Sequence, residues 1–323
     1  MKIKTLFLVT GFILTIFACE KNDRIPSITT SPVSNIDVNT ATCGGNITSD
    51  EGSPINERGI CWSTNSNPTI SDSKTNDGYG TGAFISTLTA LQPNTNYYVR
   101  AYATNDVGTG YGAAVSFVTL DGVLDIDGNG YHIVKIGNQS WLKENLKTTK
   151  YRDGTPIAGP VFYPTDQYLD DFTWYTSTSG AFCWHYYGTS NDDSYGALYN
   201  WYAVSECNLC PEGWHVPTDE EWTQLIEYVA ADGHEGTEGT ALKAENRWLY
   251  GYSGTDDYGF TALPAGRRAG GGYGGVDRKG YWWSSTEDGE NDGWYRAMDD
   301  GYKYVYRGSI EKWNGFSVRC LRD

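Results

Sequence analysis

The strongest apolar periodicity in the chain predicts one amphipathic helix. Thr218 is a suitable N-cap, and Glu221, three residues later, gives the spacing of a capping box. Asp219 and Glu220 add negative charge to the first turn, where the helix dipole favours it, and Gly233 follows as a C-terminal stop. We expect this helix to pack under a β-rich, aromatic domain. Its apolar side chains form one stripe: Trp222, Leu225, Ile226 and Val229.

A second pattern, earlier in the chain, consists of short alternating apolar runs separated by Gly, Asn and Pro. Runs at 41–47 and 58–63 are strand candidates, and 91–103 is the strongest. The segment Leu91-x-Pro93-x-Thr95-x-Tyr97 resembles the entry to strand F of fibronectin type III domains, which implies an all-β fibronectin-III-like sandwich over residues 28–120. We find no catalytic cluster there and expect a spacer. Alternate residues of the strongest run share one face: Tyr97, Val99, Ala101 and Ala103.

The N-terminus has the pattern of an export signal. Residues 1–18 combine a basic start with an apolar run too short for an ordinary membrane-spanning helix, as in a signal peptide. Residues 16–19 resemble a relaxed lipobox, which implies cleavage before Cys19 and lipidation of that cysteine. The alternative is a plain secretory signal followed by an incidental cysteine.

The residues after Cys19 bear on location. Residues 19–27 are polar and contain Pro26, which is typical of a tether. Glu20 and Asp23 resemble the surface-export tag of some Gram-negative lipoproteins. We therefore expect a lipoprotein anchored in the outer membrane of the cell envelope and exposed at the cell surface.

Length, composition and charge narrow the function classes. A chain of 323 residues favours two domains, and its 25 tyrosines, 12 tryptophans and 39 glycines suit short strands and tight turns with aromatic packing. The net charge of −16 argues against nucleic acid as a partner, because phosphate binding needs a basic face. It fits an exported protein kept in solution by self-repulsion.

The later part of the chain resembles a known family. Six segments match, in order, the pattern of the Fibrobacter succinogenes major paralogous domain, a family of extracellular bacterial modules: 128–157, 195–204, 210–222, 254–268, 281–286 and 315–323. The match covers 124–323 and gives a domain over 121–323. The resemblance implies an α+β, C-type-lectin-like fold and no assigned activity. The helix start is also similar, more distantly, to that of formylglycine-generating enzymes, whose reactive late cysteines are matched only by Cys320.

Motifs for metal binding and catalysis are incomplete. The turn 125–130 imitates a calcium loop, but Ile136 occupies the twelfth position, where a bidentate Glu is needed. The C-x-x-C at 207–210 has neither an immediately following helix nor a second pair for zinc. The glycine run 270–275 contains G-x-G-x-x-G without a strand before it or a helix after it, so we expect a mobile loop. The sugar-binding triplets of calcium-dependent lectins are absent. We expect no catalytic residue, metal or cofactor, and a protein that is not an enzyme.

Six cysteines remain after processing at Cys19, and an exported chain favours pairing them, although 15 connectivities exist. Lectin-like folds commonly tie a helix to the last strand, so the resemblance implies a disulfide between Cys210 and Cys320. The remaining pairs would then be Cys183 with Cys207, and Cys43 with Cys61.

Residues 250–307 hold the candidate ligand-binding side chains. From the loops on either side of the Trp282-Trp283 strand we predict one rim, with Tyr273 and Trp294 as stacking faces and Arg268 and Asp292 as polar contacts. The alternative is that Trp294 is buried. The aromatic candidates of the stretch are Tyr250, Tyr252, Tyr258, Tyr273, Trp294, Tyr302, Tyr304 and Tyr306.

These observations predict a non-catalytic envelope lipoprotein whose C-terminal domain binds an extracellular glycan or a surface protein. The first alternative is a structural surface protein without a specific ligand. An envelope enzyme is the least supported hypothesis, because the sequence shows no recognisable nucleophile, no pair of acid–base residues and no set of metal ligands.

Overall fold

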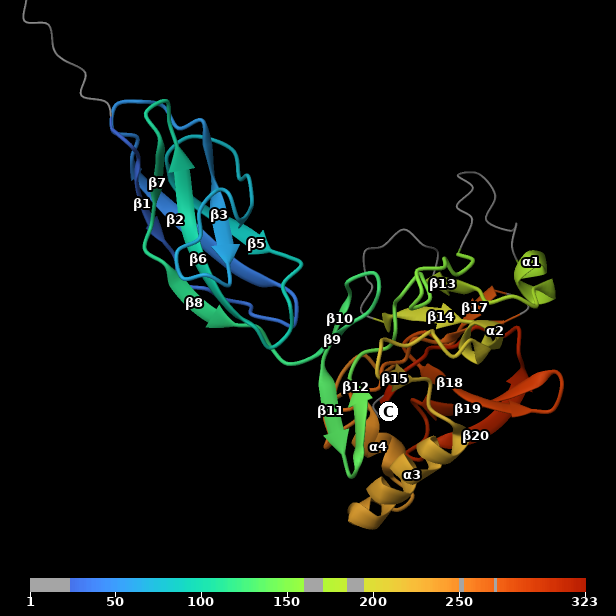
Figure 1. Cartoon of the computed structure of the whole chain (residues 1–323). Coiled ribbons are helices and arrows are strands. Elements are labelled where there is room, and N and C mark those ends of the chain that lie inside the picture. The colour runs from blue at the N-terminus through green and yellow to red at the C-terminus, as the bar shows by residue number, and fades with distance from the viewer. Residues whose placement is uncertain (1–23, 160–170, 185–194, 250–252, 270–271) are drawn as a thin grey trace, which may run out of the picture. The chain divides into compact units, whose positions relative to one another are not determined.

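The computed structural model describes residues 24–159, 171–184, 195–249, 253–269 and 272–323 (Figure 1). The predicted lipidation site, Cys19, lies outside the described residues. The chain divides into two compact units. The first comprises the residues up to Ser34, Thr42–Thr87 and Tyr97–Ser116; the second comprises Asn35–Ala41, Leu88–Asn96 and Phe117–Asp323. No helix among the described residues is long and apolar enough to cross a membrane.

The first part of the chain is an antiparallel β-sandwich, as its alternating pattern predicts. One sheet has the order β1-β2-β5 and the other the order β4-β3-β6-β7, with β8 pairing with β6. The side chains predicted to share one face of β6 are all buried, which confirms that strand. The strands are β1 (Ser27–Thr30), β2 (Ala41–Ser49), β3 (Glu57–Ser63), β4 (Ser73–Lys74), β5 (Gly82–Leu88), β6 (Asn96–Thr104), β7 (Thr109–Tyr111) and β8 (Val115–Val118).

The predicted disulfide between Cys43 and Cys61 is wrong. Both cysteines are buried thiols, on β2 of one sheet and β3 of the other. The Cys43 thiol donates to the carbonyl of Ser31 at 3.4 Å, and the Cys61 thiol donates to the carbonyl of Arg100 at 3.6 Å. Burial raises the pKa of both thiols, that of Cys61 to about 11, so they remain protonated and unreactive.

The second unit consists of small antiparallel sheets and a few short helices. A four-stranded sheet has the order β11-β12-β21-β15, and a three-stranded sheet has the order β18-β19-β20. Its strands are β9 (Val123–Leu124), β10 (Gly130–Tyr131), β11 (Ile133–Ile136), β12 (Gln139–Leu142), β13 (Phe182–Trp184), β14 (Ala197–Tyr199), β15 (Trp214–His215), β16 (Arg267–Ala269), β17 (Gly272–Gly274), β18 (Lys279–Asp288), β19 (Asp292–Asp299), β20 (Tyr306–Glu311) and β21 (Leu321–Arg322). Its helices are α1 (Asp171–Thr176), α2 (Trp201–Ser205), α3 (Asp219–Val229), the π-helix η2 (Ala230–His234) and α4 (Glu238–Leu242).

Helix α3 begins where its sequence predicts. The Thr218 hydroxyl accepts from the backbone N–H of Glu221, and the Glu221 carboxylate accepts from that of Thr218, so both halves of the capping box are present. The φ angle of Gly233 is 103°, a left-handed conformation that ends the helical segment within η2. The apolar stripe enters a core shared with Trp141, Phe260 and Trp282. Three of its four members are fully buried: Trp222, Leu225 and Val229.

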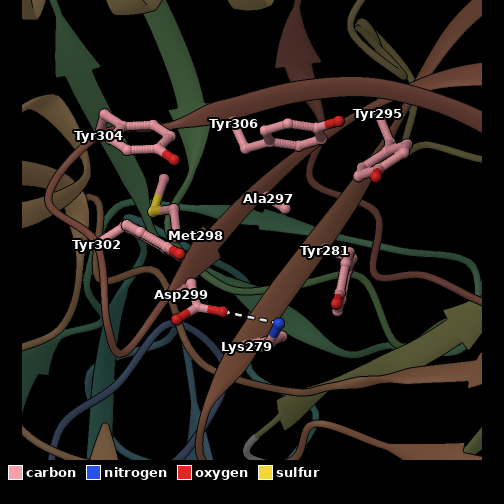
Figure 2. Close-up of a pocket in the computed structure, with 9 residues that line it drawn as sticks. All are labelled: Lys279, Tyr281, Tyr295, Ala297, Met298, Asp299, Tyr302, Tyr304 and Tyr306. Carbon is pink, nitrogen blue, oxygen red and sulfur yellow. Dashed lines mark ion pairs between the residues drawn. The ribbon is translucent and has the colours of Figure 1, made fainter.

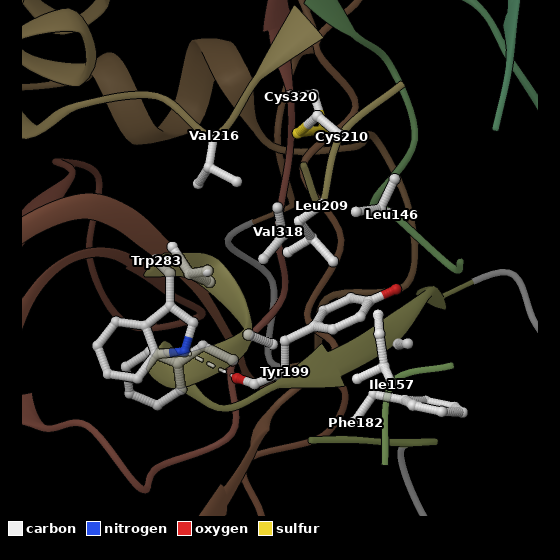
Figure 3. Packing of buried hydrophobic residues seen from close by; sticks show 14 of the residues in the cluster. Leu146, Ile157, Phe182, Tyr199, Leu209, Cys210, Val216, Trp283, Val318 and Cys320 are labelled. Carbon is white, nitrogen blue, oxygen red and sulfur yellow. Dashed lines mark hydrogen bonds between the residues drawn. A yellow bond between two sulfur atoms is a disulfide. The ribbon is translucent and has the colours of Figure 1, made fainter. Parts of the chain in front are cut away.

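A disulfide joins the approach to α3 to the end of the chain. Cys210 and Cys320 are bonded across a sequence separation of 110, which confirms the predicted pair (Figure 3). The predicted pair of Cys183 and Cys207 is wrong: Cys207 is an exposed thiol, whereas the Cys183 side chain lies inside a buried cluster with Trp174 and Leu198. In the same core cluster, the indole N–H of Trp283 donates to the carbonyl of Tyr199 at 2.8 Å (Figure 3).

Candidate functional site

The two faces of the sheet β18-β19-β20 have different neighbours, because successive side chains of a strand point to opposite sides. Trp282 and Arg296 face α3: Trp282 belongs to the same core as Trp222, and Arg296 donates to the backbone carbonyl of Asp219 at 2.9 Å. The alternate residues face the other way. In that set Tyr281 lies opposite Ala297, and Ala297 lies opposite Tyr306 on the third strand.

This second face carries a cleft of about 310 Å³ (Figure 2). The cleft is small, at the lower end of the range for ligand pockets. It combines five tyrosine rings with one lysine and one aspartate. Its lining residues are Lys279, Tyr281, Tyr295, Ala297, Met298, Asp299, Tyr302, Tyr304 and Tyr306.

One buried core residue, Phe316, packs against two of the tyrosine rings. The ring of Tyr281 stacks on that of Phe316, with centroids 4.9 Å apart and an interplanar angle of 20°. The ring of Tyr295 lies 5.1 Å from Phe316 and 6.0 Å from both Tyr281 and Tyr306. Burial raises the pKa of Tyr295 to about 12, so its hydroxyl stays protonated at neutral pH. The rings therefore offer preset apolar faces and O–H groups, and little side-chain entropy remains to be lost on binding.

A buried lysine holds the segment that carries two more tyrosines. Lys243 has no exposed surface, and its ammonium donates to the carbonyls of Asp299 and Tyr302, each at 3.1 Å. Burial lowers the pKa of Lys243. The backbone N–H of Thr240, from α4, donates to the carbonyl of Lys303 at 2.9 Å. These bonds fix the backbone beside Tyr302 and Tyr304, two residues that are 55% and 44% exposed.

The charged groups of the cleft are organised around one ion pair. Lys279 Nζ lies 2.9 Å from Asp299 Oδ2 (Figure 2). The hydrogen bond to Asp299 raises the pKa of Lys279. Burial raises the pKa of Asp299, but the hydrogen bonds from Lys279 and from the Gly301 backbone outweigh it and the net shift is downward. Both groups are therefore charged at neutral pH. A third charge lies near this pair: the Arg267 guanidinium is 5.5 Å from the centre of the Tyr281 ring, and its charge acts on Lys279.

None of the four predicted ligand-binding residues lines this cleft. Arg268 and Tyr273 are paired across the hairpin β16–β17, and the Arg268 guanidinium lies 4.4 Å from the ring of Trp174 and 5.6 Å from that of Tyr273. Gly272–Gly274 therefore forms a strand where the sequence predicts a mobile loop; residues 270 and 271 of that run lie outside the described residues. The structure brings Arg268 and Tyr273 together, against the cluster of Trp174.

Trp294 and Asp292 have different surroundings. Trp294 is half-buried, so it occupies neither an open rim nor the core. The Arg307 guanidinium covers the Trp294 ring at 3.6 Å and also donates to Asp219 at the start of α3. Asp292 pairs with Asp288 at the turn between β18 and β19. Because successive side chains of a strand point to opposite sides, Trp294 lies on the face of the sheet opposite that of its neighbour Tyr295.

Part of the cleft could be anticipated from the sequence. Tyr302, Tyr304 and Tyr306 are among the predicted aromatic candidates, whereas the strand residues were missed. Their signal is the alternation Lys279-x-Tyr281 and Tyr295-x-Ala297-x-Asp299, which places each set on one face of a strand.

The remaining motifs serve the fold. The Asp125 carboxylate accepts from the backbone N–H groups of Asp127 and Asn129 and from the hydroxyl of Tyr131, so it closes a turn. His215 lies between Glu221, at 3.1 Å, and Asp323, at 2.7 Å, and links the helix start to the last residue. Among the described parts of the chain, no group of three or more His, Cys, Asp or Glu residues could hold a metal ion.

Comparison with known proteins identifies the second unit. The chain is similar to solved structures over about a third of its length. The sensor domain of the anti-sigma factor RsgI4 from Pseudobacteroides cellulosolvens shares 20% identity, over 30% of this chain and 97% of that one, with a TM-score of 0.24. A fibronectin type III domain of the human KIAA0970 protein shares 19% identity, over 33% and 82% of the two chains, with a TM-score of 0.23.

No curated protein matches. The profile of the Fibrobacter succinogenes major domain matches residues 134–322, more than half of the chain. The chain therefore belongs to the Fibrobacter succinogenes major domain family.

Proposed function

We propose that this chain is a non-catalytic cell-envelope lipoprotein whose C-terminal domain binds an extracellular glycan in the tyrosine cleft. The observation that carries the proposal is the set of five tyrosines around the Lys279–Asp299 ion pair. A sugar ring has apolar C–H faces and a rim of hydroxyls. It therefore suits flat aromatic faces with a few fixed hydrogen-bonding groups beside them.

The architecture of the cleft supports a recognition role. The rings of Tyr281 and Tyr295 pack against Phe316, and the backbone that carries Tyr302 and Tyr304 is held by Lys243 and α4. Such preset rings are costly to expose, since apolar surface in water is unfavourable. Their retention on one side of a short sheet favours a ligand over a purely structural role.

The proposal includes the finer fold and the location. The C-terminal unit is of the C-type-lectin-like α+β kind, supported by the disulfide that ties the approach to α3 to the final strand. Lipidation of Cys19 anchors the chain in the outer membrane, and residues 19–27 hold the domains away from it. Two acyl chains make a stable anchor, where one is marginal. A Cys19→Ser variant is expected to leave the membrane fraction; its retention after a salt wash would contradict the anchor.

Binding is tested with the full chain on a glycan array. Tyr306→Ala removes a 51% exposed cleft ring, and Tyr228→Ala, on α3, removes a 43% exposed ring elsewhere in the same unit. We expect glycan binding by the wild type and by Tyr228→Ala, and a loss of about tenfold or more in Tyr306→Ala, typical of a stacking aromatic hot spot. Binding of a surface protein but of no glycan would replace the glycan with a protein partner. Binding to neither a glycan nor a surface protein would favour a structural protein without a specific ligand.

A further inference from the structure

The cleft has a local excess of positive charge although the whole chain carries −16. Its lining includes one cation, Lys279, and one carboxylate, Asp299, which neutralise each other at 2.9 Å. Arg267 does not line the cleft itself but adds a second cation beside it, over the ring of Tyr281. The backbone brings it there: the N–H of Gly266 donates to the carbonyl of Lys279 at 2.7 Å, so β16 begins beside β18. The charge of Arg267 is close enough to oppose protonation of Lys279 and to favour ionisation of Tyr295.

Arg267 is half-buried and lies with its guanidinium over the Tyr281 ring. No carboxylate among the described residues forms an ion pair with it. This sets it apart from two other arginines of the same unit, because Arg278 pairs with Asp300 at 3.1 Å and Arg307 with Asp219 at 2.8 Å. Stacking on a ring leaves the edge of a guanidinium available, and that edge matches a carboxylate or sulfate in a bidentate geometry.

A third cation lies behind the cleft. Lys243 is buried below the Asp299–Tyr302 segment, where its ammonium donates to two backbone carbonyls and lies near the carboxylates of Asp299 and Asp300. These carboxylates are paired with Lys279 and Arg278, so the charges of Lys243 and Arg267 remain as the local excess. A neutral sugar would gain little from these cations, whereas an anionic group would gain a charge-assisted hydrogen bond in a partly desolvated site.

We infer that the cleft selects an acidic saccharide, which binds with its anionic group on Arg267 and its ring against the exposed tyrosines of the cleft. This inference rests on the proposed glycan binding and names its class of ligand. Carboxylate and sulfate share the required chemistry. The unfavourable long-range field of an acidic protein is screened beyond about 8 Å at physiological ionic strength, so the local cations decide.

The test uses the full chain on an array of matched glycan pairs: uronic-acid oligosaccharides with their carboxyl-reduced forms, and sulfated oligosaccharides with their desulfated forms. We expect the acidic member of a pair to bind about tenfold or more tightly, as one charge-assisted contact allows. Equal binding of both members, or binding of neutral members alone, would overturn the acidic selectivity and leave glycan binding intact. No binding to any member would contradict both.

Two arginine variants assign the effect to Arg267. Arg267→Met keeps an apolar stem over Tyr281 and removes the charge, and Arg322→Met does the same to an exposed arginine over Trp214, 5.9 Å away, at the far end of the chain. Arg267→Met is expected to lose the preference for the acidic member and to bind its neutral partner as the wild type does. Arg322→Met is expected to keep the preference. A preference that survives in Arg267→Met, or equal losses for both members, would overturn the role of Arg267.

Discussion

Lys279 and Asp299 stand directly opposite each other on β18 and β19, and their side chains meet at 2.9 Å on the edge of the tyrosine cleft. The pair joins the first strand of the sheet to the last residue of the second, just before the segment of Tyr302 and Tyr304. Because Asp299 also accepts from the backbone N–H of Gly301 at 2.7 Å, the same carboxylate fixes the turn that follows. The ion pair therefore sets the charge at the edge of the cleft, and its carboxylate also holds the turn that leads to Tyr302 and Tyr304.

Changing the charge of this pair should change the affinity for acidic saccharides in opposite directions. Lys279→Met leaves an unpaired carboxylate in the cleft and is expected to weaken binding about tenfold, whereas Asp299→Asn is expected to strengthen it severalfold. Calorimetric titration of both variants and of the double variant gives the coupling energy of the pair. Equal effects of the two single variants would contradict an electrostatic role.

The His132–Glu144 pair predicts a pH optimum of stability. His132 Nδ1 lies 2.8 Å from Glu144 Oε1. The bond to Glu144 raises the pKa of His132 above its ordinary 6.5. Protonated His132 therefore adds fully to the unfolding free energy below pH 6.5, and this contribution is lost as the pH rises through the pKa of His132 in the folded protein. Burial raises the pKa of Glu144, but the His132 bonds outweigh it and bring it below its ordinary 4.5, so this contribution is lost on acidification.

The pair should therefore stabilise the fold most between about pH 4.5 and 6.5, by no more than about 1 kcal/mol, since both groups are partly exposed. Urea unfolding of wild type and His132→Gln across pH 4–8 measures this. The difference in unfolding free energy should be largest near pH 5.5 and should shrink on both sides. A difference independent of pH would show that His132 acts by packing alone.

Loss of the Cys210–Cys320 disulfide should be the costliest change to a cysteine. In the loop-entropy model, closing a loop of 110 residues contributes about 4–5 kcal/mol. Cys210→Ser/Cys320→Ser is expected to lower the unfolding free energy by up to that amount, and Cys207→Ser, at an exposed thiol, should leave it unchanged. Non-reducing peptide mapping checks the bond itself; a bridge between Cys207 and Cys210 would contradict it.

Substitution of Asn145, a buried polar residue, should lower the stability of the protein. Its amide oxygen accepts from the indole N–H of Trp282 at 2.8 Å and from the guanidinium of Arg319 at 3.1 Å. Asn145→Ala leaves both donors buried without this acceptor, at about 1–3 kcal/mol each. We expect thermal unfolding to shift down by several degrees or more, with no shift for Asn246→Ala at an exposed site. A shift of equal size in both variants would refute this.

Local signals in the sequence predict local structure well. The capping box of Thr218 and Glu221, the helix stripe at Trp222 and the strand face at Val99 depend on neighbours within a few residues, and each is confirmed. The bonded pair of Cys210 and Cys320 came instead from a family resemblance. Spacing alone could not find it, because the two cysteines meet only through the tertiary fold.

The candidate cleft depends on tertiary contacts that the sequence does not display. Trp294 and Tyr295 are adjacent, but the pleat of β19 sends one towards α3 and the other into the cleft. Aromatic richness cannot decide between these two directions until the register of the sheet is known. The same holds for Arg267 and Arg268, which lie over Tyr281 and Trp174 respectively. The residues predicted from the sequence, Arg268 and Trp294, are therefore direct neighbours of Arg267 and Tyr295 but lie on other faces than the cleft.

The most direct test of the tyrosine cleft is NMR of the full chain with selectively labelled tyrosine rings, titrated with an acidic oligosaccharide that binds. Ring signals are assigned by single Tyr→Phe variants. We predict that the perturbed signals, among 25 tyrosines, are those of the five cleft rings: Tyr281, Tyr295, Tyr302, Tyr304 and Tyr306. Perturbation of Tyr273 or of tyrosines outside the cleft, with the cleft rings unchanged, would contradict it.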